Sequence, residues 1–283
     1  MTTAMLEPRT RSFQGDGIEL AAEEAGPSTG RAVLLVHGGG QTRGAWGGAL
    51  KEGARRGYRM ISYDLRGHGE SGWAPDGNYS TDAHVRDLRR IVEQLGEPPA
   101  LVGASLGGVT GLQYAGEGGR LHTLTLVDIA PKMETAGVMR ITDFMLSAPN
   151  GFADLEAAAE AVAGYLPHRP RPTDSSGLMK NLRLRDDGRL HWHWDPKIVV
   201  GAGENRPVPD TERLRSAARN LTIPVLLLRG RMSDVVSPEG VKDFLQLAPH
   251  AEFVDIAGAD HMVAGDRNDA FNAAVFDFLD RHR

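Results

Sequence analysis

Residues 99–109 read Pro-Ala-Leu-Val-Gly-Ala-Ser-Leu-Gly-Gly-Val and contain a G-x-S-x-G motif, Gly103 to Gly107, between an apolar strand and a helix. A nucleophile on such a sharp strand-to-helix turn needs small residues two positions before and after it, because the strained backbone brings these flanking residues close together. The turn also places the first N–H groups of a helix beside Ser105, where they can stabilise an oxyanion. The motif therefore predicts a serine nucleophile, although an ordinary glycine-rich strand–helix turn can have the same sequence.

The rest of the chain alternates short apolar runs with amphipathic or Gly/Pro-containing stretches, which is typical of βα units that form a mostly parallel sheet. We expect strands at residues 11–13, 18–23, 32–37, 58–63, 100–103, 121–127, 223–229 and 251–256, and helices at about 80–95, 105–115 and 268–278. The alternation breaks down between about Met133 and Ala218, where helical patches accompany a proline-rich segment at 167–172. We therefore predict a core formed by residues 1–132 and 219–283, with a mostly helical cap inserted at 133–218.

Composition narrows the class of function. The net charge is −5, with 32 basic and 37 acidic residues interspersed, so no dense basic stripe favours nucleic-acid binding. The chain has no cysteine, which excludes a thiolate nucleophile and thiolate metal ligands. Its first residues lack the apolar region of a secretory signal, and no apolar run is long enough to span a membrane. We expect a cytoplasmic protein that acts on a small molecule and binds neither nucleic acid nor membrane.

A serine hydroxyl needs a neighbouring imidazole to take its proton and a carboxylate to orient that imidazole. His261 lies in a loop after the last predicted strand, where strand ends converge on a site, and we assign it as the base. Asp234 follows the strand at 223–229 and is the preferred acid, on the chain order Ser, Asp, His and on its spacing to His261. Asp128, which follows the strand at 121–127, is the competing acid.

An oxyanion formed at Ser105 also needs two N–H donors. The N–H of Leu106, directly after the serine, supplies one. The Gly38-Gly39-Gly40 turn after its strand supplies the other, because glycines let the backbone approach a ligand closely, and Gly39 is our choice among the three.

These motifs, together with the Asp64-Leu65-Arg66-Gly67-His68-Gly69-Glu70-Ser71 segment, resemble the α/β-hydrolase family in the same order along the chain. The resemblance runs from about Ala32 to the C-terminus and is strongest to the cofactor-free haloperoxidase, esterase and lactonase branch. It implies a mostly parallel eight-stranded sheet with helices on both faces, a cap after the sixth strand, and a catalytic triad and oxyanion hole that need no cofactor or metal. It also implies that the Asp64–Ser71 segment is structural, so His68 is left out of the catalytic set.

The same resemblance leaves several activities open. Hydrolysis of an ester or lactone through an acyl-enzyme is the preferred function. Epoxide hydrolases and haloalkane dehalogenases are minor alternatives, because they use an aspartate where this chain has Ser105. Carbon–carbon bond hydrolysis, cofactor-free haloperoxidase or perhydrolase activity, and a non-catalytic small-molecule receptor remain alternatives.

The substrate pocket is expected to be mostly apolar, since large apolar residues lie near the expected site loops. The candidates for lining it are Trp46, Met133, Phe144, Met145, Trp192, Trp194 and Met262. The cap sequence His191-Trp192-His193-Trp194 also permits a two-histidine metal site, but without a third ligand cap packing is the better interpretation, with one face of the Trp/His alternation lining the pocket.

Overall fold

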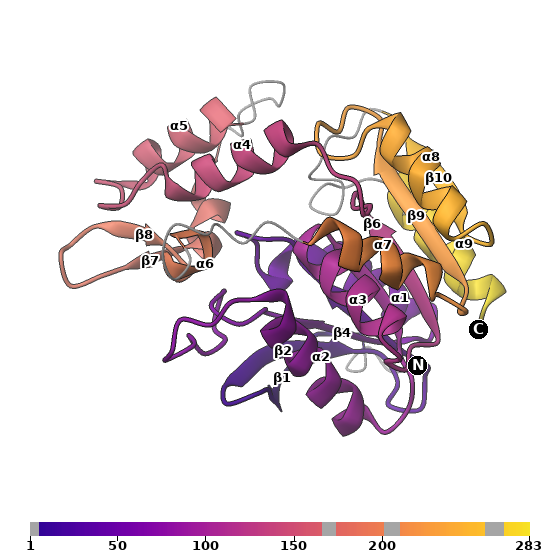
Figure 1. The fold of residues 1–283 in the computed structure, drawn as a ribbon. Helices are drawn as coiled ribbons and strands as arrows, with labels where there is room; N and C mark the ends of the chain where they lie inside the picture. The colour runs from indigo at the N-terminus through magenta and orange to yellow at the C-terminus, as the bar shows by residue number, and fades with distance from the viewer. Residues whose placement is uncertain (1–5, 166–173, 201–209, 258–268) are drawn as a thin grey trace.

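An eight-stranded, mostly parallel sheet forms the centre of the molecule in the computed structural model, which describes residues 6–165, 174–200, 210–257 and 269–283 (Figure 1). Its order is β1-β2-β4-β3-β5-β6-β9-β10, and β2 runs antiparallel to both of its neighbours. The strands are β1 (Arg9–Gln14), β2 (Glu19–Ala25), β3 (Ala32–Val36), β4 (Arg59–Tyr63), β5 (Ala100–Ala104), β6 (Thr123–Val127), β9 (Val225–Gly230) and β10 (Glu252–Ile256). The predicted sheet is confirmed, with strand boundaries shifted by a few residues.

Two apolar layers hold helices on the two faces of this sheet. One layer packs α2 (Thr81–Leu95), α3 (Leu106–Gly116), α7 (Thr211–Arg219) and α8 (Pro238–Leu247) against the sheet, and the other packs α1 (Gly47–Arg55) and α9 (Asp269–Arg281). Successive strand residues alternate between the layers, as Leu34 and Leu35 do. Because both faces are covered, the central strands are continuous apolar runs, which made them predictable. The sequence analysis did not predict α1 or α8.

The cap lies beside the core in Figure 1 and carries a short strand pair in addition to its helices. It contains α4 (Thr135–Leu146), α5 (Leu155–Tyr165), the short helix α6 (Lys197–Val200) and an antiparallel pair, β7 (Leu182–Leu184) and β8 (Leu190–Trp192). Helix α7 falls within the range predicted for the cap, yet it packs on α3 of the core. A Cβ placed on Gly116 of α3 would lie 2.3 Å from the carbonyl oxygen of Ala217 in α7.

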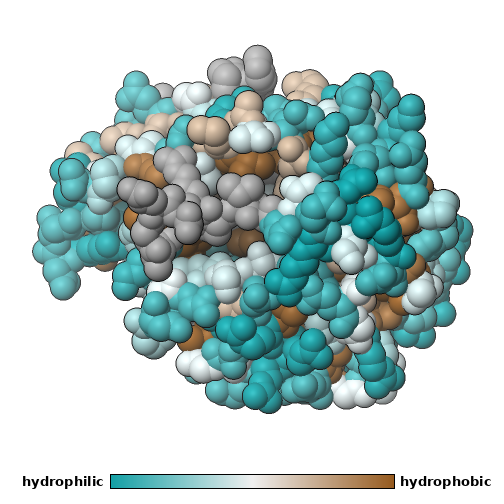
Figure 2. Space-filling model, viewed as in Figure 1, coloured by the Kyte–Doolittle hydropathy of each residue, from teal (hydrophilic) through white to brown (hydrophobic). Residues whose placement is uncertain are grey.

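On the face shown in Figure 2, hydrophilic residues predominate and hydrophobic residues appear in small, separate areas. Within the described ranges, the helices are too short or too polar to cross a bilayer.

The sheet topology decides where a site can form. Strand β3 lies between β4 and β5, so the chain passes to one side of β3 and then to the other. Loops after parallel strands diverge at such a switch point and leave a crevice at the carboxyl ends. The Gly38-Gly39-Gly40 turn follows β3 and Ser105 follows β5, so both lie at this edge.

Candidate active site

Ser105 occupies a strained backbone turn between β5 and α3. Its φ is 45° and its ψ is −114°, a conformation that a residue with a Cβ rarely adopts. The flanking glycines make the turn possible, since a Cβ on Gly103 would lie 2.6 Å from the backbone of Gly107, and one on Gly107 would lie 2.4 Å from the carbonyl oxygen of Val36. Ser105 itself is only half-buried, so part of this residue stays accessible to solvent.

The glycine turn after β3 lies directly beside this serine. A Cβ on Gly38 would be 3.2 Å from the Cβ of Ser105. The N–H of Gly38 donates to Oε1 of Gln41 at 3.0 Å, and the N–H of Gly40 donates to Nε2 of His68 at 3.1 Å. The N–H of Gly39 has no acceptor among the described residues, so it is the donor of this turn that a ligand can use.

The second predicted donor is the N–H of Leu106. Leu106 is the first residue of α3, and the N–H groups of a helix's first turn have no partner within the helix. They also carry the positive end of the helix dipole. The turn after β3 and the start of α3 therefore present donors on two sides of Ser105, which suits a developing oxyanion.

Two buried histidines hold the glycine turn in place. His37 donates from Nδ1 to the carbonyl of Gly38 at 2.8 Å and accepts the N–H of Leu65 at Nε2. His68 donates from Nδ1 to the carbonyl of Arg66 at 3.0 Å, while its Nε2 accepts from Gly40. Since each ring uses one nitrogen as an acceptor, both must be neutral. Burial lowers the pKa of His37 to about 4 and that of His68 to about 3. His68 therefore positions the turn.

A third histidine ties the cap to the same region. Nδ1 of His193 accepts the N–H of Gly69 at 2.7 Å, and its ring lies 6.0 Å from that of His68. Two residues further on, the N–H of Asp195 donates to the carbonyl of Gly67 at 2.9 Å. The carboxylate of Asp195 accepts the hydroxyl of Tyr79 at 2.6 Å. The 64–71 segment thus holds the glycine turn on one side and the cap on the other.

The two candidate acids differ sharply in their surroundings. Asp128 follows β6, is fully buried and has a φ of 51°; it and Ser105 are the non-glycine residues with positive φ in the described part of the chain. Its carboxylate accepts the hydroxyl of Ser233 at 2.5 Å and the N–H of Gly230 at 3.2 Å. The strand that carries it adjoins the nucleophile, since the N–H of Ser105 donates to the carbonyl of Val127 at 3.1 Å.

Asp234 instead faces the cap. Its carboxylate lies 2.8 Å from the guanidinium of Arg140 in α4 and is 36% exposed. The loop turns inward at Ser233, the residue before Asp234. The Oγ of Ser233 accepts the N–H groups of Val235 and Val236 at 3.1 Å and donates to the carboxylate of Asp128.

Four of the predicted pocket residues form part of one cap cluster. The indoles of Trp192 and Trp194 stack at 4.9 Å, and Phe144 lies 5.5 Å from Trp192. A Cβ on Gly40 would lie 3.4 Å from Sδ of Met145 and 3.5 Å from Trp194. The cluster therefore reaches the glycine turn through Met145 and Trp194. The two indoles share a face, as the Trp/His alternation predicts.

Trp46 and Met133, which were also predicted to line the pocket, pack outside this cluster. Trp46 is 1% exposed and packs against Phe271 in the layer beneath α1 and α9, rather than with the cap aromatics. Met133 is half-buried against the opposite layer of the core. His261 and Met262 lie outside the described residues, so their assignments stay predictions.

Metal-binding geometry is absent from the described ranges, where no three His, Asp or Glu side chains are grouped to hold an ion. His191 and His193 have separate partners, because His191 bonds Asp187 at 2.8 Å while His193 bonds Gly69.

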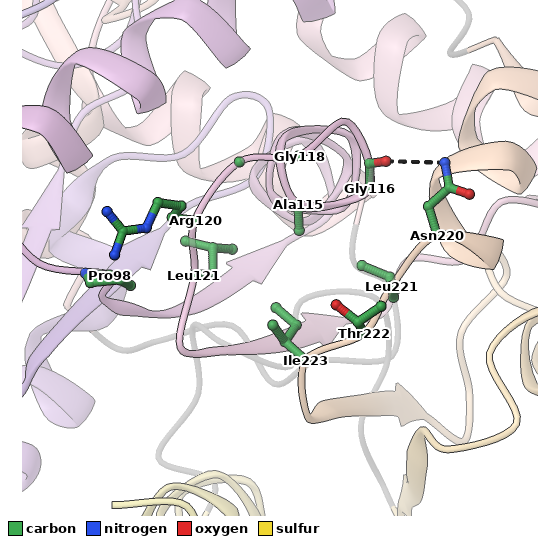
Figure 3. A pocket seen from close by; sticks show the side chains of 11 residues that line it. Pro98, Ala115, Gly116, Gly118, Arg120, Leu121, Asn220, Leu221, Thr222 and Ile223 are labelled. Carbon is green, nitrogen blue, oxygen red and sulfur yellow. Dashed lines mark hydrogen bonds between the residues drawn. The ribbon is translucent and has the colours of Figure 1, made fainter.

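A separate cavity of about 500 Å³ opens at the other end of the sheet (Figure 3). Pro98, Leu121 and Ile223 line it, and each of these residues precedes a strand, so the cavity lies at the amino ends of β5, β6 and β9. Asn220 closes one side by donating to the carbonyl of Gly116 at 3.2 Å. Arg120 is the charged residue of its lining, which contains no acid–base pair. Among the described residues, this cavity therefore offers no catalytic groups, and the carboxyl edge of the sheet is the better candidate for the active site.

Comparison with known proteins agrees with the fold described above. The family model described as alpha/beta hydrolase fold matches residues 31–267. An esterase of Mycobacterium tuberculosis is 29% identical over 88% of this chain and 82% of its own length. The N-formylmaleamate deformylase of Pseudomonas putida is 28% identical over 89% of each chain.

Solved structures agree on the fold. The crystal structure of E-2-(acetamidomethylene)succinate hydrolase superimposes with a TM-score of 0.83 over 97% of this chain and 100% of that one. Its sequence identity is 23%, so this likeness speaks for the fold alone.

Because the buried histidines are neutral in the folded protein, we predict that the free energy of unfolding decreases in acid. Burial lowers the pKa of His37 to about 4, that of His68 to about 3 and that of His193 to about 2, all below their ordinary value of 6.5. The unfolded chain therefore binds more protons below that value, so the free energy of unfolding decreases as the pH falls from about 6.5 towards 4. Urea unfolding at a series of pH values measures this slope.

The variant His68→Gln keeps an acceptor for Gly40 but cannot take up a proton. It should show a shallower decrease than the wild type, while replacement of the exposed His250 by Gln serves as the matched control. Equal slopes in wild type and His68→Gln would contradict the account.

Proposed function

Because the chain belongs to the α/β-hydrolase fold family, we propose that it hydrolyses a carboxylic ester or lactone of a small, largely apolar molecule through an acyl-enzyme on Ser105. One observation carries this proposal: a serine in a strained turn, with φ of 45°, lies beside a glycine turn in which the N–H of Gly39 has no acceptor among the described residues. The strain is retained where the surrounding structure enforces it, which is typical of functional sites. The esterase relative supports the ester class.

The proposed reaction has two halves. His261 takes the proton of the Ser105 hydroxyl as its oxygen attacks the carbonyl carbon, and the N–H groups of Gly39 and Leu106 stabilise the resulting oxyanion. Collapse of the tetrahedral intermediate breaks the bond to the leaving oxygen, which takes the proton from His261. Water then attacks the acyl-enzyme by the same route and releases the acid.

We assign the carboxylate that orients His261 to Asp128, with Asp234, which lies nearer to His261 along the chain, as the alternative. A carboxylate in this role must be fixed and shielded so that it can support the imidazolium. Asp128 meets this need, since it is fully buried and bonded to Ser233 and Gly230. Asp234 is partly exposed and already paired with Arg140.

Turnover assays test the function. The wild type should hydrolyse short p-nitrophenyl esters and simple lactones, and Ser105→Ala should lower kcat by several orders of magnitude without lowering the melting temperature. An N-formyl amide belongs in the panel, because one relative is named a deformylase. No turnover of any substrate by the folded protein would contradict the proposal and favour a receptor role. Equal turnover by Ser105→Ala would exclude the acyl-enzyme.

A pair of isosteric variants distinguishes the acids. Asp128→Asn should lower kcat by about 10³ to 10⁴, because the imidazole loses its orienting charge. Asp234→Asn should change kcat by less than about tenfold, since it loses only a partly exposed ion pair. Circular dichroism and thermal melting confirm that each variant folds. An inactive Asp234→Asn beside an active Asp128→Asn would return the role to Asp234.

A further inference from the structure

Helix α4 of the cap crosses the carboxyl edge of the sheet. Its first turn lies at the loop after β9, where the N–H of Glu134 donates to the carbonyl of Val235 at 2.8 Å and a Cβ on Gly137 would lie 2.2 Å from the carbonyl oxygen of Asp234. Its last turn lies at the loop after β3, where Met145 contacts Gly40. The helix is therefore anchored at both ends of its span.

The span matches the width of the strands between these anchors. Strands β3, β5, β6 and β9 are consecutive in the sheet, and neighbouring strands lie about 4.8 Å apart, so β3 and β9 are separated by roughly 14 Å. The eight residue-to-residue steps from Gly137 to Met145 rise about 12 Å along a helix. The middle of α4 must then lie over the ends of β5 and β6, which carry Ser105 and Asp128.

Ile141 is the residue at that midpoint. Positions 137, 141 and 145 are four residues apart and share one face of the helix, and Gly137 and Met145 both contact the loops at the sheet edge. Ile141 therefore faces the same edge between them. The exposed Met139 lies on the opposite face, two residues from Gly137 and 49% accessible.

The surroundings of Ile141 are apolar but not closed. Its side chain is half-buried and packs against both the core layer beneath α3 and the aromatic cap cluster. Val138 and Leu106 are also half-buried at the border of that core layer. Apolar side chains that keep some accessible surface at this border form a wall that a nonpolar ligand group can complete.

We propose that Ile141 is a specificity-determining residue that limits the length of the acyl chain bound at Ser105. The inference rests on the proposed ester hydrolysis. The acyl group of the substrate packs against Ile141 where α4 crosses the ends of β5 and β6, and the side chain of Ile141 restricts it to short chains. The substrate class is thus esters of short aliphatic acids.

The test compares p-nitrophenyl butyrate with p-nitrophenyl octanoate in wild type, Ile141→Ala, Ile141→Phe and the control Met139→Ala. The ratio of kcat/KM for octanoate over butyrate should rise about tenfold in Ile141→Ala, because the shorter side chain makes room for several methylene groups. It should fall by a similar factor in Ile141→Phe and stay within about twofold in Met139→Ala. Ile141→Val is the milder variant should Ile141→Ala fold poorly, and its ratio should rise about threefold.

The outcomes separate this inference from the function on which it rests. Ester turnover that depends on Ser105, with the same chain-length ratio in all Ile141 variants, would overturn the role of Ile141 alone. A change of equal size in Met139→Ala would do the same, because it would reflect general loosening of α4. A shift seen only when acetate esters of longer alcohols are compared would place Ile141 on the leaving-group side and overturn the acyl assignment. No turnover of any ester by the wild type would overturn both proposals.

Discussion

The close approach of α3 to the ends of β3 and β5 is the constraint on which the site depends. Gly103 and Gly107 let these backbones meet at distances that no Cβ could tolerate, with 2.4 Å between a Cβ on Gly107 and the carbonyl of Val36. The chain must then turn at Ser105 with a positive φ, and strain of this kind persists only where the surrounding packing enforces it. The same turn brings the start of α3 beside the glycine turn after β3, so packing of the fold forms the candidate site.

Neutral histidines connect this site to the cap. His37 and His68 fix the carbonyl of Gly38 and the N–H of Gly40, which leaves Gly39 between them as the donor open to a ligand. His193 reaches the same segment from the cap. Two hydrogen bonds of under 3.2 Å therefore connect the cap to the glycine turn: His193 accepts from Gly69, and His68 accepts from Gly40. Displacement of the cap would change the position of the glycine turn through these bonds rather than through loose apolar contact. A cap built this way helps to hold the shape of the glycine turn.

Much of the fold could be predicted from the sequence, because buried parallel strands leave continuous apolar runs and the motif around Ser105 specifies its own turn. The orientation of the carboxylates could not. The spacing to His261 favours Asp234, but whether a loop turns its carboxylate inward depends on contacts such as those of Ser233 with Asp128, which have no sequence signature. Similar limits apply to Trp46, whose place in the core follows from α1, and to Ile141, whose position over the sheet edge follows from where both ends of α4 are anchored.

Covalent labelling tests most directly whether the strained turn makes Ser105 a nucleophile. The folded protein would be treated with a small dialkyl fluorophosphate and digested, and its peptides examined by mass spectrometry beside Ser105→Ala. The account predicts one adduct per chain on the peptide that contains Ser105, and no adduct in the variant. A folded wild type that carries no adduct, or an adduct on another serine that persists in Ser105→Ala, would contradict it.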